Sequence, residues 1–296
     1  MGHAFRGKGA WDEAIAAYNQ AIRLKPDEAS IHYNLGLALE NRGALDEAIA
    51  AYKDAIRFHA DYAEAFCNVG QALKQKGQFS EALTALRRGD ELGSRNPRWP
   101  YPSARWVQEC ERLVDLDGRL PAVLRGEVVP VSAAERIEFA KLCALKKLNV
   151  ASAHLFQQAF ASQPELANDI EGGRRYDAAC CAALAGSGKG EDAVPLDEAK
   201  RATWRRQTLE WLRADLAYWA RQAESDSPQA RLVVQKKLEH WRRDPDFSGV
   251  RGEAALATLP EAERDAWRKL WTDVENTLAK SRRMNLPEEK SQKKLE

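Results

Sequence analysis

Residues 11–56 read WDEAIAAYNQAIRLKPDEASIHYNLGLALENRGALDEAIAAYKDAI, and this stretch decides the fold. Residues in and around it recur at a spacing of 34 over three copies. Five positions keep this register: Gly2, Gly36 and Gly70; Gly9, Gly43 and Gly77; Ala14, Ala48 and Ala82; Tyr18, Tyr52 and Leu86; and Ala21, Ala55 and Gly89. A fixed period of this length predicts a repeat protein built from stacked helical or mixed units.

Each copy predicts two helices joined by a short turn. In the second copy we expect the first helix to run from about Ala29 to Asn41 and the second from about Leu45 to Phe58, because apolar residues recur there at helical spacing. Gly43 is expected to end the first helix, since glycine adopts the left-handed conformation easily. The small Gly36 allows the two helices to approach, and the large Tyr52 fills the gap to the next unit.

The quoted stretch resembles tetratricopeptide repeats (TPRs), and the resemblance covers residues 1 to about 94. It implies an all-α fold, a right-handed superhelix of helix pairs. The first helix of each pair would line a concave groove that binds peptides. The sequence departs from the repeat pattern at Ala60 and Ser94, where the closing proline is missing, and at Gly89, where alanine is usual.

The resemblance also implies which residues line the groove. These are Tyr33, Asn34, Leu37, Asn68, Gln71 and Lys74, with His3, Arg6, Glu40 and Glu64 beside them. In the family, the asparagine at the position of Asn34 and Asn68 often hydrogen-bonds the backbone of a bound peptide. Members that clamp a peptide's terminal carboxylate carry a lysine where this chain has Glu64, which argues against such a ligand. The alternative, that these residues form an ordinary solvated helix face, stays open.

The rest of the chain is divided by changes in composition. The expected segments are the repeat array at 1–94, a connector rich in proline and aromatic residues at 95–131, degenerate TPR-like helices at 132–190, further helices at 191–281 and a disordered tail at 282–296. The connector is expected to become helical near Ser103 and to be interrupted at Gly118 and Pro121. Ser132 followed by Glu135 forms a capping box that predicts a new helix start.

Residues 130 to about 280 are similar to the region that ends many planctomycete-type bacterial serine/threonine kinases with TPR arrays. The resemblance rests on RYDAACCAALAGSGKGEDA and LEWLRADLAYWA. It implies an alternative function, the C-terminal regulatory or docking portion of a kinase whose catalytic domain lies outside this chain. A kinase needs a glycine-rich loop, a strand lysine and the HRD and DFG motifs, and the sequence contains none of them.

The chain begins in the middle of a repeat, so we expect either a fragment or a true start further upstream. An uncovered repeat edge at Met1 could stack on a second copy, which makes self-association a third hypothesis.

No catalytic residue, metal or cofactor is predicted. The run Gly186-Ser187-Gly188-Lys189-Gly190 lacks the first glycine and the Ser/Thr of a phosphate-binding loop. The five histidines lack metal-ligand spacing. Cys180 and Cys181 point about 100° apart on a helix, so they are expected to be core residues. Most of the nine tryptophans fall on apolar helical stripes and are likewise assigned to the core.

Composition narrows the class of protein further. The formal net charge is +1, so no strong field favours nucleic acid or an anionic membrane. No apolar run could serve as a signal peptide or a membrane span. The five cysteines form no CxxC pair and no regular disulfide framework. These features favour a cytoplasmic, non-catalytic scaffold that binds a protein or peptide partner in a TPR groove.

Overall fold

The computed structural model describes residues 8–283, and every regular element in that range is a helix. The all-α helical-repeat fold predicted from the sequence is therefore confirmed. The chain divides into two compact units, Met1–Val129 and Pro130–Glu296. None of the described helices combines the length and the apolar character needed to cross a membrane. Of the tail predicted at 282–296, residues 282 and 283 belong to the last helix, and residues 284–296 lie outside the described range.

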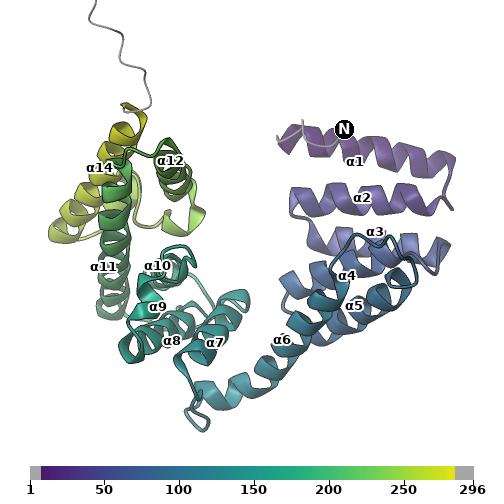
Figure 1. The fold of residues 1–296 in the computed structure, drawn as a ribbon, viewed down its shortest axis with the longest axis horizontal. Coiled ribbons are helices and arrows are strands. Elements are labelled where there is room, and N and C mark those ends of the chain that lie inside the picture. The colour runs from purple at the N-terminus through teal and green to yellow at the C-terminus, as the bar shows by residue number, and fades with distance from the viewer. Residues whose placement is uncertain (1–7, 284–296) are drawn as a thin grey trace, which may run out of the picture. The chain divides into compact units, whose positions relative to one another are not determined.

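Unit 1 is a stack of antiparallel helix pairs (Figure 1). Its helices are α1 (Lys8–Leu24), α2 (Ala29–Arg42), α3 (Leu45–Phe58), α4 (Ala63–Gln75), α5 (Phe79–Gly93) and α6 (Ser103–Leu124). The hairpins α2–α3 and α4–α5 are complete repeats, and in each the second helix begins sixteen residues after the first. The first helix of the first repeat falls largely outside the described residues, as do His3 and Arg6.

Left-handed glycines make the turns of both hairpins. Gly43 has a φ of 87°, and its N–H bonds to the carbonyls of Glu40 and Leu39 at the end of α2. Gly77 has a φ of 76° at the end of α4. In each turn the following residue donates to a carbonyl five positions back, which is the bond pattern that closes many helices. The turn predicted from Gly43 is confirmed.

The two helices of each pair can approach closely because one of them has a glycine at the point of contact. A Cβ added to Gly36 would lie 2.5 Å from the ring of Tyr52, and one added to Gly70 would lie 2.5 Å from Leu86. Tyr52 and Leu86 are fully buried in the core of unit 1. This explains in physical terms why the repeat keeps a glycine at one position and a large residue sixteen positions later.

The predicted connector contains a helix of 22 residues, α6. The expected interruptions at Gly118 and Pro121 were wrong, because α6 runs through both. Pro121 lies in the last turn of α6, and the helix ends three residues after it, so the backbone bond that its missing N–H removes lies close to the helix end. Gly118 has no neighbouring atom within 4 Å of where a Cβ would stand.

Unit 2 begins with a hairpin of the same dimensions as the repeats. The helices of the unit are α7 (Ala133–Leu145), α8 (Asn149–Ser162), α9 (Glu165–Asn168), α10 (Arg174–Gly186), α11 (Glu198–Ala223), α12 (Pro228–Arg243), the 3-10 helix η1 (Pro245–Phe247), α13 (Glu253–Leu256) and α14 (Glu261–Arg283). Again α8 starts sixteen residues after α7. The turn between them has Lys147, with a φ of 58°, where the repeats have glycine. Ser132 caps α7 as expected, accepting from the N–H of Glu135.

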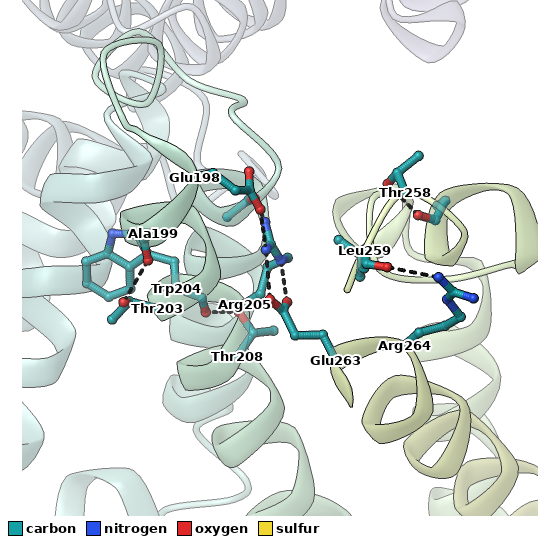
Figure 2. A network of polar contacts seen from close by, with 12 residues as sticks. Glu198, Ala199, Thr203, Trp204, Arg205, Thr208, Thr258, Leu259, Glu263 and Arg264 are labelled. Atoms are coloured by element: carbon teal, nitrogen blue, oxygen red, sulfur yellow. Dashed lines mark hydrogen bonds and ion pairs between the residues drawn. The ribbon is translucent and has the colours of Figure 1, made fainter. Parts of the chain in front are cut away.

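A buried arginine links the later helices of unit 2 (Figure 2). Arg205 on α11 is 3% exposed, and its guanidinium donates to Glu263 on α14 at 2.7 and 3.1 Å, to Glu198 at 2.6 Å and to the carbonyl of Gly186 at 3.1 Å. Such a charge is stable when buried only if it is fully paired. The network therefore fixes the end of α10 and the start of α14 against α11, while α12 packs on α11 and α14.

Candidate peptide-binding groove

The six predicted groove residues lie on two successive first helices. Tyr33, Asn34 and Leu37 are on α2, and Asn68, Gln71 and Lys74 are on α4. All six side chains are half-buried, neither part of the core nor fully in solvent. A surface with this intermediate exposure on adjacent helices can hold an extended chain, because polar groups there remain within reach of a ligand while water is partly excluded.

Tyr33 and Asn68 are in direct contact. The amide nitrogen of Asn68 donates to the hydroxyl of Tyr33 at 3.1 Å, and the ring of Tyr33 stacks on Tyr62 with centroids 4.9 Å apart. Burial raises the pKa of Tyr33 to about 12, and the negative charge of Glu64 adds to this rise. Tyr33 therefore keeps its proton at any ordinary pH and can still donate it to a ligand.

The other groove residues differ in their partners. Asn34 and Gln71 make no side-chain hydrogen bond to any residue in the described range. Lys74 lies 3.9 Å from Glu109 on α6, which offsets its charge. Glu40 accepts from the hydroxyl of Tyr52 at 2.7 Å and from Gln75 at 3.3 Å. The free carboxamides of Asn34 and Gln71 each offer a donor and an acceptor, the complement of a peptide group.

Sequence reasoning did not assign α6 to the candidate groove, although Glu109 of α6 pairs with Lys74 of α4. The buried Ser103 and Cys110 and the half-buried Val107 of α6 follow the pattern of Ala65, Ala72 and Val69 in α4 at a spacing of 38 instead of 34. In this register Trp106 takes the position of Asn34 and Asn68, and it packs against the core of unit 1. A search for the repeat that allowed four extra residues in the connector would have identified α6 as a further first helix.

The extra residues bring two aromatic side chains to the groove. In Figure 1 the connector between α5 and α6 runs back across α4. Trp99 covers Gly93 and donates to Ser103 at 2.9 Å, while Tyr101 meets Trp99 edge-on with centroids 4.9 Å apart. Tyr101 is close enough to Tyr33 for its negative charge to raise the pKa of Tyr33. Through these contacts Trp99 and Trp106 anchor the connector to unit 1.

The glycine-rich run after α10 cannot cradle a phosphate. A phosphate-binding loop needs free backbone N–H groups that point at the anion. Here the N–H groups of Ser187, Gly188 and Lys189 all bond back to carbonyls of α10. The run begins at the last residue of α10 and continues as the turn that follows this helix.

All five cysteines are free thiols. Burial raises the pKa of the Cys143 thiol to about 12 and that of Cys181 to about 11, which leaves neither as a reactive thiolate at neutral pH. Cys180 lies with Asp244 and Asp246 in a group whose ligand atoms are within 4.8 Å of one another. Sequence reasoning missed this group. Asp244 already accepts from Tyr176 and from the N–H of Asp246, which marks it as a cap of η1.

Comparison with known families places TPRs in the first third of the chain. A TPR repeat model matches residues 2–43 and 41–77, and a tetratricopeptide repeat model matches residues 63–92. These residues are therefore tetratricopeptide repeats. The similarity of residues 130 to about 280 to the C-terminal region of kinases finds no support in the comparisons. No curated protein matches the chain significantly.

Several solved TPR structures are similar to parts of the chain. The TPR2B domain of yeast Sti1, solved as a pHsp70 complex, is 23% identical over 37% of this chain and 86% of that one, with a TM-score of 0.33. YrrB, described as a TPR protein with an unusual peptide-binding site, is 14% identical over 90% and 98%, with a TM-score of 0.24. Yeast Tom70 is 15% identical over 94% and 59%, with a TM-score of 0.34.

Proposed function

We propose that this protein is a non-catalytic scaffold whose unit 1 binds an extended peptide segment of a partner protein in the groove formed by α2, α4 and α6. TPR repeats typically mediate such binding. The observation that carries the proposal is a pair of half-buried carboxamides on successive first helices, Asn34 and Gln71, which make no side-chain hydrogen bond within residues 8–283.

The physical reason is the match between a carboxamide and a backbone peptide group. Each has one carbonyl acceptor and N–H donors, so either can bond to the other from a fixed helix without reading the peptide's side chains. Side-chain selectivity then falls to the surrounding rings of Tyr33, Tyr62 and Trp106. A half-buried site strengthens each of these bonds relative to open water.

Selection from a random dodecapeptide library displayed on phage tests this proposal. The wild-type chain is expected to enrich a peptide family that the double variant Asn34→Ala/Gln71→Ala binds at least about tenfold more weakly, the loss expected for two hydrogen bonds. A matched control is Asn19→Ala/Gln20→Ala, which removes two exposed amides from α1. Equal binding by the groove variant and the control, or no enrichment at all, would rule the proposal out.

No observation favours the kinase-associated alternative, and self-association at the edge near Met1 involves residues outside the described range.

A further inference from the structure

One end of the groove combines aromatic rings with carboxylates that lack basic partners. Tyr33 and Tyr62 stack there, and Tyr101 is 43% exposed beside them. Glu28 and Glu64 flank these rings. Burial raises the pKa of Tyr62, and the negative charges of Glu64, Glu28 and Tyr101 raise it further, so all of these groups act on one another at short range.

Neither carboxylate is neutralised within the described part of the chain. Glu28 accepts only the hydroxyl of Ser30 at 2.8 Å, and Glu64 has no hydrogen bond or ion pair there. Two basic side chains on α4 and α6, Lys74 and Arg105, pair with Glu109 at 3.9 and 2.9 Å and not with Glu28 or Glu64. A half-buried carboxylate beside aromatic faces attracts a cation, because both the charge and the ring quadrupoles favour it.

We propose, building on the peptide-binding function above, that the partner segment is basic and that it places an arginine side chain against the aromatic cluster of Tyr33, Tyr62 and Tyr101, with its guanidinium paired to Glu64. Arginine fits better than lysine, since a planar guanidinium stacks on rings and pairs with a carboxylate through two parallel bonds.

The spacing along α4 suits such a ligand. Glu64 precedes Asn68 by four residues, a separation of about 6 Å along a helix axis. This is about the reach of an extended arginine side chain, so one residue can pair with Glu64 while its backbone meets the carboxamides of Asn68 and Gln71. Glu64, which stands where other members have a lysine, thus gives the groove a preference for basic segments over terminal carboxylates.

Peptides recovered from the phage selection provide the test, measured at pH 8, where an unperturbed histidine is mostly uncharged. Recovered sequences are expected to be enriched in arginine. In a synthetic fluorescein-labelled copy of the best peptide, replacing that arginine by citrulline, its uncharged isostere, is expected to weaken binding to the wild type about tenfold. With Glu64→Gln the same replacement should change affinity less than about twofold.

Glu13→Gln is the matched control, because Glu13 is an exposed carboxylate of α1 and does not belong to the proposed site. It should leave the arginine preference unchanged. Recovered peptides that are neutral or acidic, or that respond to citrulline equally in wild type and Glu64→Gln, would overturn this inference while leaving the peptide-binding function standing. A selection that enriches nothing would instead remove the function itself.

Discussion

Lys147 is a residue held in a conformation that suits glycine. Its φ of 58° places it in the left-handed region, where a side chain costs about 1–2 kcal/mol. We expect Lys147→Gly to stabilise the α7–α8 hairpin by about 0.5–1 kcal/mol, since relief of strain exceeds the entropy that glycine loses on folding. Slower amide exchange in both helices would show this by mass spectrometry.

Two further variants separate strain from loss of the lysine charge. Lys147→Val should destabilise the hairpin, because a branched side chain tolerates this region least. Lys146→Gly, next to it but with a φ of −88°, should also destabilise it. Faster exchange in Lys147→Gly than in wild type would contradict the strain argument.

Asp215 is a buried acid whose environment makes stability depend on pH. Its side chain is 6% exposed, and burial raises its pKa to about 6, although the charge of Arg175 at 3.0 Å acts in the opposite direction. The unfolded pKa is about 4. Between pH 4 and 6 the folded form therefore keeps a proton that the unfolded form releases, so this group's contribution to stability falls as pH rises through that window.

Removing the charge should remove that penalty. Asp215→Asn is expected to increase the free energy of unfolding by about 1–2 kcal/mol at pH 7.5 and to have little effect at pH 4, as judged from the calorimetric midpoint. Asp226→Asn, which changes an exposed acid in the same unit, should have no such pH dependence. A gain from Asp215→Asn that is equal at both pH values would show that the shifted pKa is not its cause.

At the residue scale, repetition predicted which groove positions to examine but not how they pair. Tyr33, Asn34 and Asn68 were found because the period identifies equivalent positions. The bond from Asn68 to Tyr33 joins different repeats and depends on how the helices pack, which spacing alone does not determine. The same holds for the buried ion pair of Asp215 and Arg175, because no pattern in the sequence indicates that these two side chains meet.

At the scale of elements, α6 is the helix that ends the repeat array. Its buried side chains continue the pattern of α4, but the face that α4 packs against its own second helix is polar in α6. The positions of Gly70 and Leu73, thirty-eight residues on, are Gln108 and Glu111, and both are exposed. Terminal repeats commonly carry such a polar face, since no further repeat covers it.

Restoring the apolar face should make α6 self-associate. We expect Gln108→Leu/Glu111→Leu to convert unit 1 into an open-ended stack whose oligomer fraction rises with concentration in light-scattering measurements. The pair Arg87–Glu111 lost in this variant is exposed and contributes little. Gln108→Ser/Glu111→Gln keeps the face polar and should match the wild type in size. A double-leucine variant of unchanged size at all concentrations would refute the cap assignment.

The position of α6 also shows which helices the 34-residue period cannot predict. Helix pairs with intact glycines were predicted to within one residue, since α2 and α3 begin where expected. The connector breaks the period by four residues, and for that reason α6 was not predicted to belong to the candidate groove. The helix breaks predicted at Gly118 and Pro121 were wrong for another reason. A helix tolerates a glycine that packs against nothing, and it can include a proline in its last turn.

At the scale of the whole molecule, each unit has its own buried core and its own terminal turns. The core of unit 1 is built on Tyr52 and Leu86, and that of unit 2 includes Phe139, Phe156 and Trp267. A compact unit with its own core is expected to fold alone. We therefore predict that residues 1–129 and 130–296, expressed separately, are helical by circular dichroism and unfold cooperatively.

A matched cut within a unit provides the comparison. Division between residues 146 and 147 separates α7 from α8 and should leave the shorter C-terminal piece without half of its first hairpin, hence with a shallower, less cooperative transition. Because every proposed groove residue belongs to unit 1, residues 1–129 alone should bind the selected phage peptides within about twofold of the full chain, a difference of less than half a kcal/mol. Helical and cooperative halves with no peptide binding by residues 1–129 would mean that unit 2 supplies part of the site.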